Sequence, residues 1–192
     1  KQTVWRPGET IIAGIGQGYV LVTPMQLALM TARIANGGKK IIPTLIKSDG
    51  KILNNFLNAA ISKDNLNIIK RAMESVTLDE FGTGRTFRLG NKGVEMAGKT
   101  GTVQVRRIST IERESEEGVI KNEDRIWERR EHALYVGYAP VEKPKYAISV
   151  IVEHGGSGSS KAGPIARDIM EATLHNDPTK FIPKNPIQKP IV

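Results

Sequence analysis

The sequence GVEMAGKTGTVQV, residues 93–105, decides how the middle of this chain folds. It matches the phosphate-loop pattern of nucleotide-binding proteins, because Gly93 is followed after four residues by Gly98, Lys99 and Thr100. A phosphate loop joins a buried strand to a helix whose first amides bind phosphate. Here no apolar run precedes Gly93, and the residues after Lys99 alternate between β-branched and polar. The pattern therefore favours a strand beginning near Gly98, with a P-loop nucleotide-binding protein as the alternative.

The composition limits the classes of function. A chain of 192 residues with 39% apolar residues is long enough for the core of one domain or a large part of a bigger one. The formal net charge of +8 is spread along the chain, with no basic stripe interleaved with aromatics, so we expect no nucleic-acid partner. The chain has no cysteine and its three histidines lie far apart. We therefore expect no disulfide, no metal site and no cofactor.

Two segments before the Lys-Thr-Gly strand carry helix signals. The first helix is predicted to begin at Pro24, with Thr23 as N-cap and Gln26 completing a capping box, and to end before Asn36. The second is predicted to begin after Ser62. Its expected core face consists of Leu66, Ile69, Met73 and Val76. Between the two helices, residues 40–53 predict a short β segment that turns at Asp49 and Gly50.

The second half of the chain alternates as a β-hairpin does. Residues 132–140 and 146–156 read as two antiparallel strands, and residues 163–176 read as a final helix with Pro164 near its start. Residues 106–131 are dense in both signs of charge, which predicts an exposed and partly helical excursion. These elements predict a mixed α/β fold of the α+β class, in which helices flank an antiparallel sheet. We expect one domain over residues 1–176 and a disordered Pro/Lys-rich tail over residues 177–192.

Several segments together resemble a known enzyme family. Lys-Thr-Gly on a strand is one of three motifs of the penicillin-recognising serine acyltransferases. WRPGET, GIGQGYVLVTPMQLALMTARIANGG, the GTG loop, AGKTGTVQV, HALYVGYAP and VEHGGSG look like class B penicillin-binding proteins of the penicillin-binding protein 2 type, in the same order. The resemblance covers residues 4–175. It implies the serine D,D-transpeptidase fold, similar to β-lactamases, with a five-stranded antiparallel sheet and an active site beside the Lys-Thr-Gly strand.

The resemblance also implies roles for single residues. Such enzymes attack the D-Ala-D-Ala end of a peptidoglycan stem peptide, form an acyl-serine and pass the acyl group to an amine. Lys99 is the candidate catalytic residue, whose charge would favour deprotonation of the nucleophile. Thr100, Gly101 and Thr102 are the candidate substrate-binding residues, with the Thr102 N–H as half of an oxyanion hole. Regular alternation puts Lys99 and Thr100 on opposite faces, so we expect a twist or bulge to bring both to one cleft.

The other two catalytic motifs are missing. Ser48 to Lys51 matches Ser-x-x-Lys, but Asp49 and Gly50 predict a turn there, and the Ser62 match to the second motif is better explained by helix capping. We therefore expect the C-terminal part of a transpeptidase domain that lacks the nucleophile, is inactive alone and is prone to form homodimers through uncovered sheet surface.

The expected parent is a penicillin-binding enzyme on the periplasmic face of the bacterial inner membrane. Its expected partners are peptidoglycan stem peptides, β-lactams and the cell-wall elongation machinery. A non-catalytic interaction module is a further alternative for the chain by itself. The sequence predicts no function for residues 106–131.

Overall fold

The sheet lies at the centre of the structure. The computed structural model describes residues 4–45, 60–90, 93–106, 108–116 and 118–177. Within these ranges β1 (Ala97–Val103), β2 (His132–Ala139) and β3 (Tyr146–Val152) form one antiparallel sheet in the order β1-β2-β3. The predicted strand at Lys-Thr-Gly and the predicted hairpin are both confirmed.

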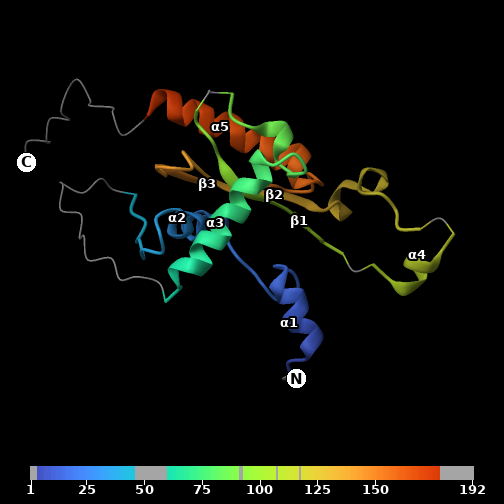
Figure 1. The fold of residues 1–192 in the computed structure, drawn as a ribbon. Coiled ribbons are helices and arrows are strands. Elements are labelled where there is room, and N and C mark those ends of the chain that lie inside the picture. The colour runs from blue at the N-terminus through green and yellow to red at the C-terminus, as the bar shows by residue number, and fades with distance from the viewer. Residues whose placement is uncertain (1–3, 46–59, 91–92, 107, 117, 178–192) are drawn as a thin grey trace, which may run out of the picture.

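Helices flank both faces of this sheet, as expected for the α+β class. The described helices are α1 (Pro7–Gly14), α2 (Pro24–Ala35), α3 (Lys63–Leu78), α4 (Thr110–Glu114) and α5 (Gly163–Asn176). The short helical turns are η1 (Arg85–Phe87), η2 (Asn122–Asp124), η3 (Trp127–Arg129) and the π-helical η4 (Gly158–Ala162). Helix α5 covers one face, while α2 and α3 lie against the other (Figure 1). None of the described helices is long and apolar enough to cross a membrane.

Each face of the sheet has its own apolar cluster, because successive side chains of a strand point to opposite sides. On the α5 face, Tyr135 packs edge-on against Phe87 at a ring distance of 5.2 Å, together with Met96 and Met170. On the opposite face, Tyr138 packs with Ala97, and Ala35 of α2 and Met73 of α3 complete that cluster. The two clusters fix the position of β1 between helices from both ends of the chain.

The predicted starts of α2 and α3 are confirmed by their capping bonds. The Thr23 hydroxyl accepts from the N–H of Gln26 at 3.2 Å, and the Gln26 side chain accepts from the N–H of Thr23 at 2.8 Å. The Ser62 hydroxyl accepts from the N–H of Asn65 at 3.2 Å. Ser62 is therefore a helix cap and no catalytic motif. Its side-chain bond satisfies one of the N–H groups that the first turn of α3 leaves without an intrahelical partner.

One helix was not predicted, and one local prediction is wrong. Residues 7–14 form α1, because Pro7 suits the first helical turn and the Glu9 carboxylate accepts from the N–H of Arg6 at 2.5 Å. Ile69 was placed on the core face of α3 but is 39% exposed, whereas Thr77 is buried. The buried stripe runs through Leu66, Met73 and Thr77 instead, because the Thr77 hydroxyl reaches the carbonyl of Met96 on the sheet side.

Other predictions have only partial outcomes. Residues 41–45 form no strand, and the turn at residues 49–50 lies outside the described residues, as does Ser48. The charged excursion is partly helical, with α4, η2 and η3 inside it. Of the predicted tail, only Asp177 is described. It is buried, accepts from the Tyr146 hydroxyl and pairs with Lys145 at 3.4 Å, so the folded part extends at least one residue past the predicted boundary.

Candidate functional site

Strand β1 is the edge of the described sheet, and its outer side carries backbone groups that β2 does not use. The carbonyl of Thr100 accepts from the Lys99 ammonium at 2.7 Å, and the carbonyl of Thr102 accepts from the Gln17 side-chain amide at 3.1 Å. In an antiparallel strand the N–H and C=O of one residue point to the same side. The N–H groups of Thr100 and Thr102 therefore also face this open edge.

The strand register shows where the predicted site residues point. Lys99 lies opposite Val136 and Thr100 lies opposite Tyr135, with one-to-one pairing from Ala97 to Val103. Thr100 therefore shares the α5 face with Tyr135, and Lys99 lies on the α2/α3 face. No bulge interrupts β1, so of the two expected alternatives, a twist or a bulge, the bulge is excluded. The Lys99 side chain instead bends over the strand edge, which brings its ammonium to the same open side as the Thr100 backbone.

A groove runs along this part of β1. It has a volume of about 340 Å³ and is lined by Thr83, Lys99, Thr100, Gly101, Thr102, Ser157, Gly158 and Ser159. The Thr83 and Thr100 hydroxyls are 3.0 Å apart, and the Ser157 and Ser159 hydroxyls are 2.9 Å apart. Within the part of the chain that the structure describes, Lys99 has no ion-pair partner. The groove thus combines hydroxyl donors with one uncompensated positive charge, a combination that attracts a carboxylate.

Two glycines allow the close packing around this groove. A Cβ at Gly98 would meet the Tyr135 hydroxyl at 2.0 Å and the carbonyl of Val136 at 2.5 Å. A Cβ at Gly158 would meet the carbonyls of Gly101 and Leu134 at 2.4 Å. Only a residue without a side chain fits either position. Gly98 lets Tyr135 pack against β1, and Gly158 lets η4 lie directly against β1 and β2.

The structure brings together all four site residues predicted from the sequence and adds others. Sequence reasoning missed Gln17, Thr83, Ser157 and Ser159 as groove or edge contacts. Their segments did stand out as glycine-rich stretches, GIGQG, GTG and GGSGSS. Glycine-rich loops often approach other backbones closely, which is a signal that could have pointed to these segments. It did not reveal which side chains in them face β1, because that depends on tertiary packing.

The nucleotide-binding alternative is wrong. Gly98, Lys99 and Thr100 lie in a strand that pairs with β2, and the first helix after them among the described residues is α4 at Thr110. A phosphate loop requires curled amides at a helix N-terminus. These amides are extended, so they cannot form one.

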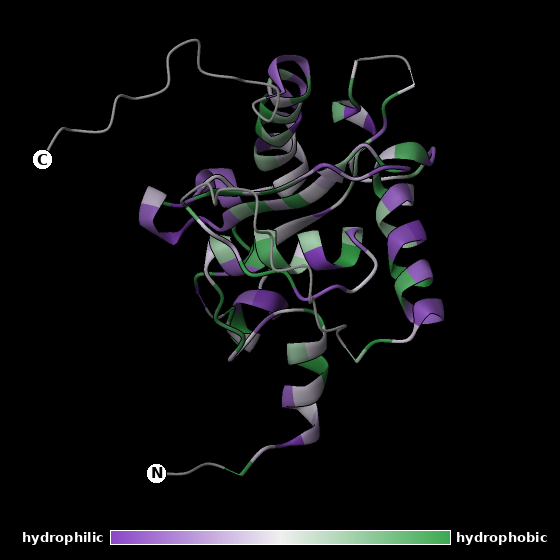
Figure 2. Ribbon diagram, turned by 90° about the vertical axis from the view of Figure 1, so that its left-hand side faces the viewer, coloured by the Kyte–Doolittle hydropathy of each residue, from purple (hydrophilic) through white to green (hydrophobic). Residues whose placement is uncertain are grey.

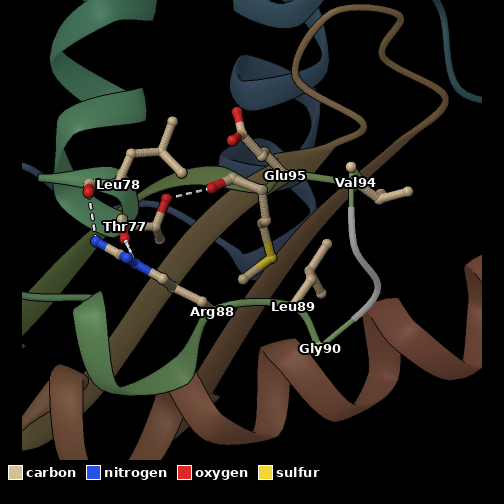
Figure 3. A pocket seen from close by; sticks show the side chains of 9 residues that line it. Thr77, Leu78, Arg88, Leu89, Gly90, Val94 and Glu95 are labelled. Atoms are coloured by element: carbon tan, nitrogen blue, oxygen red, sulfur yellow. Dashed lines mark hydrogen bonds between the residues drawn. The ribbon is translucent and has the colours of Figure 1, made fainter.

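A second cavity, with a volume of about 250 Å³, lies at the C-terminal end of α3 (Figure 3). The Arg88 guanidinium donates to the carbonyls of Thr77 and Leu78, and Thr77 in turn donates to the carbonyl of Met96. Arg88 therefore caps the end of α3. None of the residues lining this cavity lines the groove. The described residues also contain no cluster of three or more His, Asp or Glu side chains that could hold a metal.

Comparison with known proteins identifies the fold. The penicillin binding protein transpeptidase domain family matches residues 2–171. The chain belongs to this family. The matched range includes Lys99, Thr100 and Gly101.

Named relatives of this transpeptidase domain agree. The chain is 35% identical over 179 residues to the peptidoglycan D,D-transpeptidase MrdA of Haemophilus influenzae. This alignment covers 89% of this chain but only 26% of MrdA. It resembles Pseudomonas aeruginosa PBP2 in complex with WCK 5153, with a TM-score of 0.68, 37% identity and coverage of 90% of this chain and 34% of that chain. It also resembles Helicobacter pylori PBP2 in its complex with MreC, with a TM-score of 0.73, 31% identity and coverage of 92% and 29%. The described transpeptidase fold thus spans about a quarter to a third of these relatives.

Proposed function

We propose that this chain is part of a peptidoglycan D,D-transpeptidase that cross-links stem peptides through an acyl-serine intermediate. The observation that carries the proposal is the Lys99 ammonium at the open edge of β1, 2.7 Å from the carbonyl of Thr100, beside a groove lined with hydroxyls. Membership of the transpeptidase family and the 35% identity to MrdA support it. The nucleophilic serine and its helix belong to a part of the enzyme outside these residues.

The edge geometry suits an extended peptide. A stem peptide that lies along β1 bonds to the N–H groups of Thr100 and Thr102, which sets its register. Its terminal carboxylate meets the hydroxyls of Thr100 and Thr102, which share one face of the strand, and the field of the Lys99 ammonium. Gly101 presents no side chain against the peptide. These four residues therefore bind and orient the donor.

The same arrangement stabilises the acyl transfer. The serine oxygen attacks the carbonyl of the penultimate D-Ala, the peptide C–N bond breaks and the terminal D-Ala leaves as a protonated amine. The N–H of Thr102 donates to the oxyanion as half of the oxyanion hole, and Lys99 favours the deprotonated serine. An amine on a neighbouring stem then takes the acyl group from the serine. Penicillins acylate the same serine because they mimic the D-Ala-D-Ala end.

The parent protein acts at the periplasmic face of the bacterial inner membrane, where its substrate is made into wall. Its macromolecular partner is the cell-wall elongation machinery. The complex of the similar Helicobacter pylori PBP2 with MreC supports this partner. Nucleic acid plays no part in the proposal, and no cofactor is needed for an acyl transfer between serine and amine.

Residues 1–192 alone should be inactive and should self-associate. Helix α1 has no buried residue and projects away from the sheet (Figures 1 and 2). Ile11 in this helix is 72% exposed, and Ile15 just after it is 74% exposed. Apolar side chains at such exposure favour contacts between copies. We expect a concentration-dependent dimer in analytical ultracentrifugation. A monomer at all concentrations would contradict this part of the proposal.

Labelling with a fluorescent penicillin tests the function. The complete gene product should give a stable adduct that peptide mapping assigns to a serine outside residues 1–192, and it should release D-Ala from a stem pentapeptide. Residues 1–192 alone should give neither result. An adduct on a serine within these residues, or a complete protein that neither labels nor releases D-Ala, would refute the proposal.

A further inference from the structure

The last part of the charged excursion is attached to the segment that follows β3. The ladder between β2 and β3 ends at Ala133 and Val152, but the two chains stay bonded beyond it. The N–H of Gly156 donates to the carbonyl of Glu131 at 2.8 Å, and the N–H of His154 donates to the His132 ring nitrogen Nδ1 at 2.8 Å. These two hydrogen bonds hold the segment after β3 to the segment before β2, beyond the end of the strand pairing and closer to the groove.

Side chains of the excursion complete this attachment. The His154 ring nitrogen Nδ1 lies 2.9 Å from the carbonyl of Arg130, so this nitrogen carries the proton and donates. The ring of Trp127 packs against the ring of His154 at 4.3 Å. The His132 ring lies edge-on to that of His154 at 4.6 Å and accepts at Nδ1, so its proton is on Nε2. Each ring is thereby held in one orientation.

Asn122 links this attachment to the glycine turn. Its side-chain oxygen accepts from the N–H of Glu131 at 2.8 Å, and a Cβ on Gly156 would meet its amide nitrogen at 2.7 Å. Gly156 has a φ of 82°, a conformation that favours glycine. Arg125, whose side chain is 7% exposed, pairs with the Glu131 carboxylate at 3.2 Å. Glu131 is therefore fixed through both its backbone and its side chain.

The segment held in this way leads directly into a wall of the groove. Ser157 and Ser159, which line the groove, follow Gly156. Gly158 between them packs on the carbonyls of Gly101 and Leu134. The wall is thus supported by the strands on one side and by residues 122–132 before it. Loosening the second support would leave the wall hydroxyls without a fixed distance from the edge of β1.

We propose that residues 122–132 are a positioning brace, which fixes the Ser157–Ser159 wall opposite Lys99–Thr102 and so sets how tightly the groove holds the end of the donor peptide. The brace acts through the wall and does not touch the reacting atoms. The consequence for the donor rests on the proposed transpeptidase function. The mechanical role of the brace does not rest on the proposed function, because it follows from the bonds of Asn122, Glu131 and His132 alone.

Hydrogen exchange on the complete gene product tests the mechanical role. His132→Ala should raise amide exchange over residues 155–160 by about tenfold relative to α2, because the bond from the His154 N–H is lost. His132→Asn keeps an acceptor near the position of Nδ1 and should restore most of the protection. Asn122→Ala, outside the strands, should have the same local effect as His132→Ala. His175→Ala, at an exposed position of α5, is the matched control and should change nothing over residues 155–160.

Acylation by a β-lactam tests the consequence for the groove. The second-order rate constant of acylation combines the dissociation constant of the β-lactam with the first-order rate constant of acylation. In His132→Ala and Asn122→Ala the affinity for the β-lactam should fall about tenfold, with a smaller change in the first-order rate constant, because the reacting groups stay in place. Unchanged exchange over residues 155–160, or exchange that rises equally in α2, would overturn the brace. Raised local exchange with unchanged acylation would also overturn its role in the groove. If the variants show the expected exchange pattern but the wild-type protein is never acylated, the proposed function is refuted and the mechanical role stands.

Discussion

The ammonium of Lys99 lies 2.7 Å from the backbone carbonyl of Thr100, the next residue in the same strand. Their side chains start on opposite faces of β1, since Lys99 lies opposite Val136 and Thr100 opposite Tyr135. The long side chain of lysine spans the strand edge, which a shorter cation could not do. This contact explains how one uninterrupted strand presents both a positive charge and a row of hydroxyls to the same groove.

Replacing Lys99 should abolish most of the chemistry and little of the stability. Lys99→Met keeps the length of the side chain but removes the charge that favours the serine anion, so β-lactam acylation of the complete protein should fall by about 100-fold or more. The melting temperature should stay unchanged because Lys99 is exposed. Lys143→Met, another exposed position, is the control and should acylate normally. Full acylation of the Lys99 variant would remove Lys99 from the catalytic machinery.

Gly98 should not tolerate a side chain. In Gly98→Ala the new Cβ would meet the Tyr135 hydroxyl at 2.0 Å and the Val136 carbonyl at 2.5 Å, so the strands must shift. We expect a loss of about 1–3 kcal/mol in the free energy of unfolding, measured by urea denaturation. Adding Tyr135→Phe removes the hydroxyl but leaves the ring carbon Cζ at 2.3 Å and the Val136 carbonyl at 2.5 Å, so the double variant should recover only a small part of this loss. Gly8→Ala in α1, where nothing lies within 4 Å, serves as the control and should be neutral or slightly stabilising.

The buried hydroxyl of Thr77 should contribute through its bond to the carbonyl of Met96, which joins α3 to the chain entering β1. Thr77→Val keeps the shape but leaves that buried carbonyl unpaired, which should cost about 1–3 kcal/mol in urea denaturation. Thr77→Ser retains the hydroxyl and should lose less, mainly through the missing methyl group. If the serine and valine variants are equally destabilised, the hydrogen bond is not the source of the effect.

Alkaline pH should destabilise the fold through its buried tyrosines. Burial raises the pKa of Tyr138 to about 12, and Glu74 nearby adds to the shift. Because the unfolded chain ionises near pH 10, stability is fully present below that pH and is lost as pH rises toward the folded pKa. Tyr138→Phe removes this loss. Since the Tyr138 hydroxyl has no hydrogen-bond partner among the residues that the structure describes, the change should be neutral or stabilising at pH 8.

The measurement is urea denaturation at pH 8 and pH 11. The difference in the free energy of unfolding between Tyr138→Phe and wild type should be about 1 kcal/mol more favourable to the variant at pH 11 than at pH 8. Burial also raises the pKa of Tyr135, so the variant retains part of the alkaline loss. Tyr19→Phe, at a position 70% exposed, should show no such difference between the two pH values. If the difference in the free energy of unfolding between Tyr138→Phe and wild type is the same at both pH values, Tyr138 does not titrate on unfolding.

Local chemistry explains why some elements could be predicted from the sequence. The caps Thr23 and Ser62 act within one helical turn, so their residue types alone marked the starts of α2 and α3. Alternation along residues 132–152 is visible without knowing what covers each face. The same approach was wrong at Ile69. Its spacing fits the apolar stripe, but Ile69 is exposed, whereas Thr77 is buried and bonds to the carbonyl of Met96 just before β1.

The sequence by itself determined that Lys99, Thr100, Gly101 and Thr102 lie on a strand, and the order of segments that resembles a transpeptidase. Only the tertiary structure decided what surrounds that strand: Gln17 at the Thr102 carbonyl, Thr83 at the Thr100 hydroxyl, and Ser157 and Ser159 across the groove. The alternation of β-branched and polar residues that favours a strand extends over neighbours one or two residues away, which the sequence displays directly. Contacts between positions 17 and 102, or 83 and 100, depend on how whole helices and loops pack, and no local pattern encodes that packing.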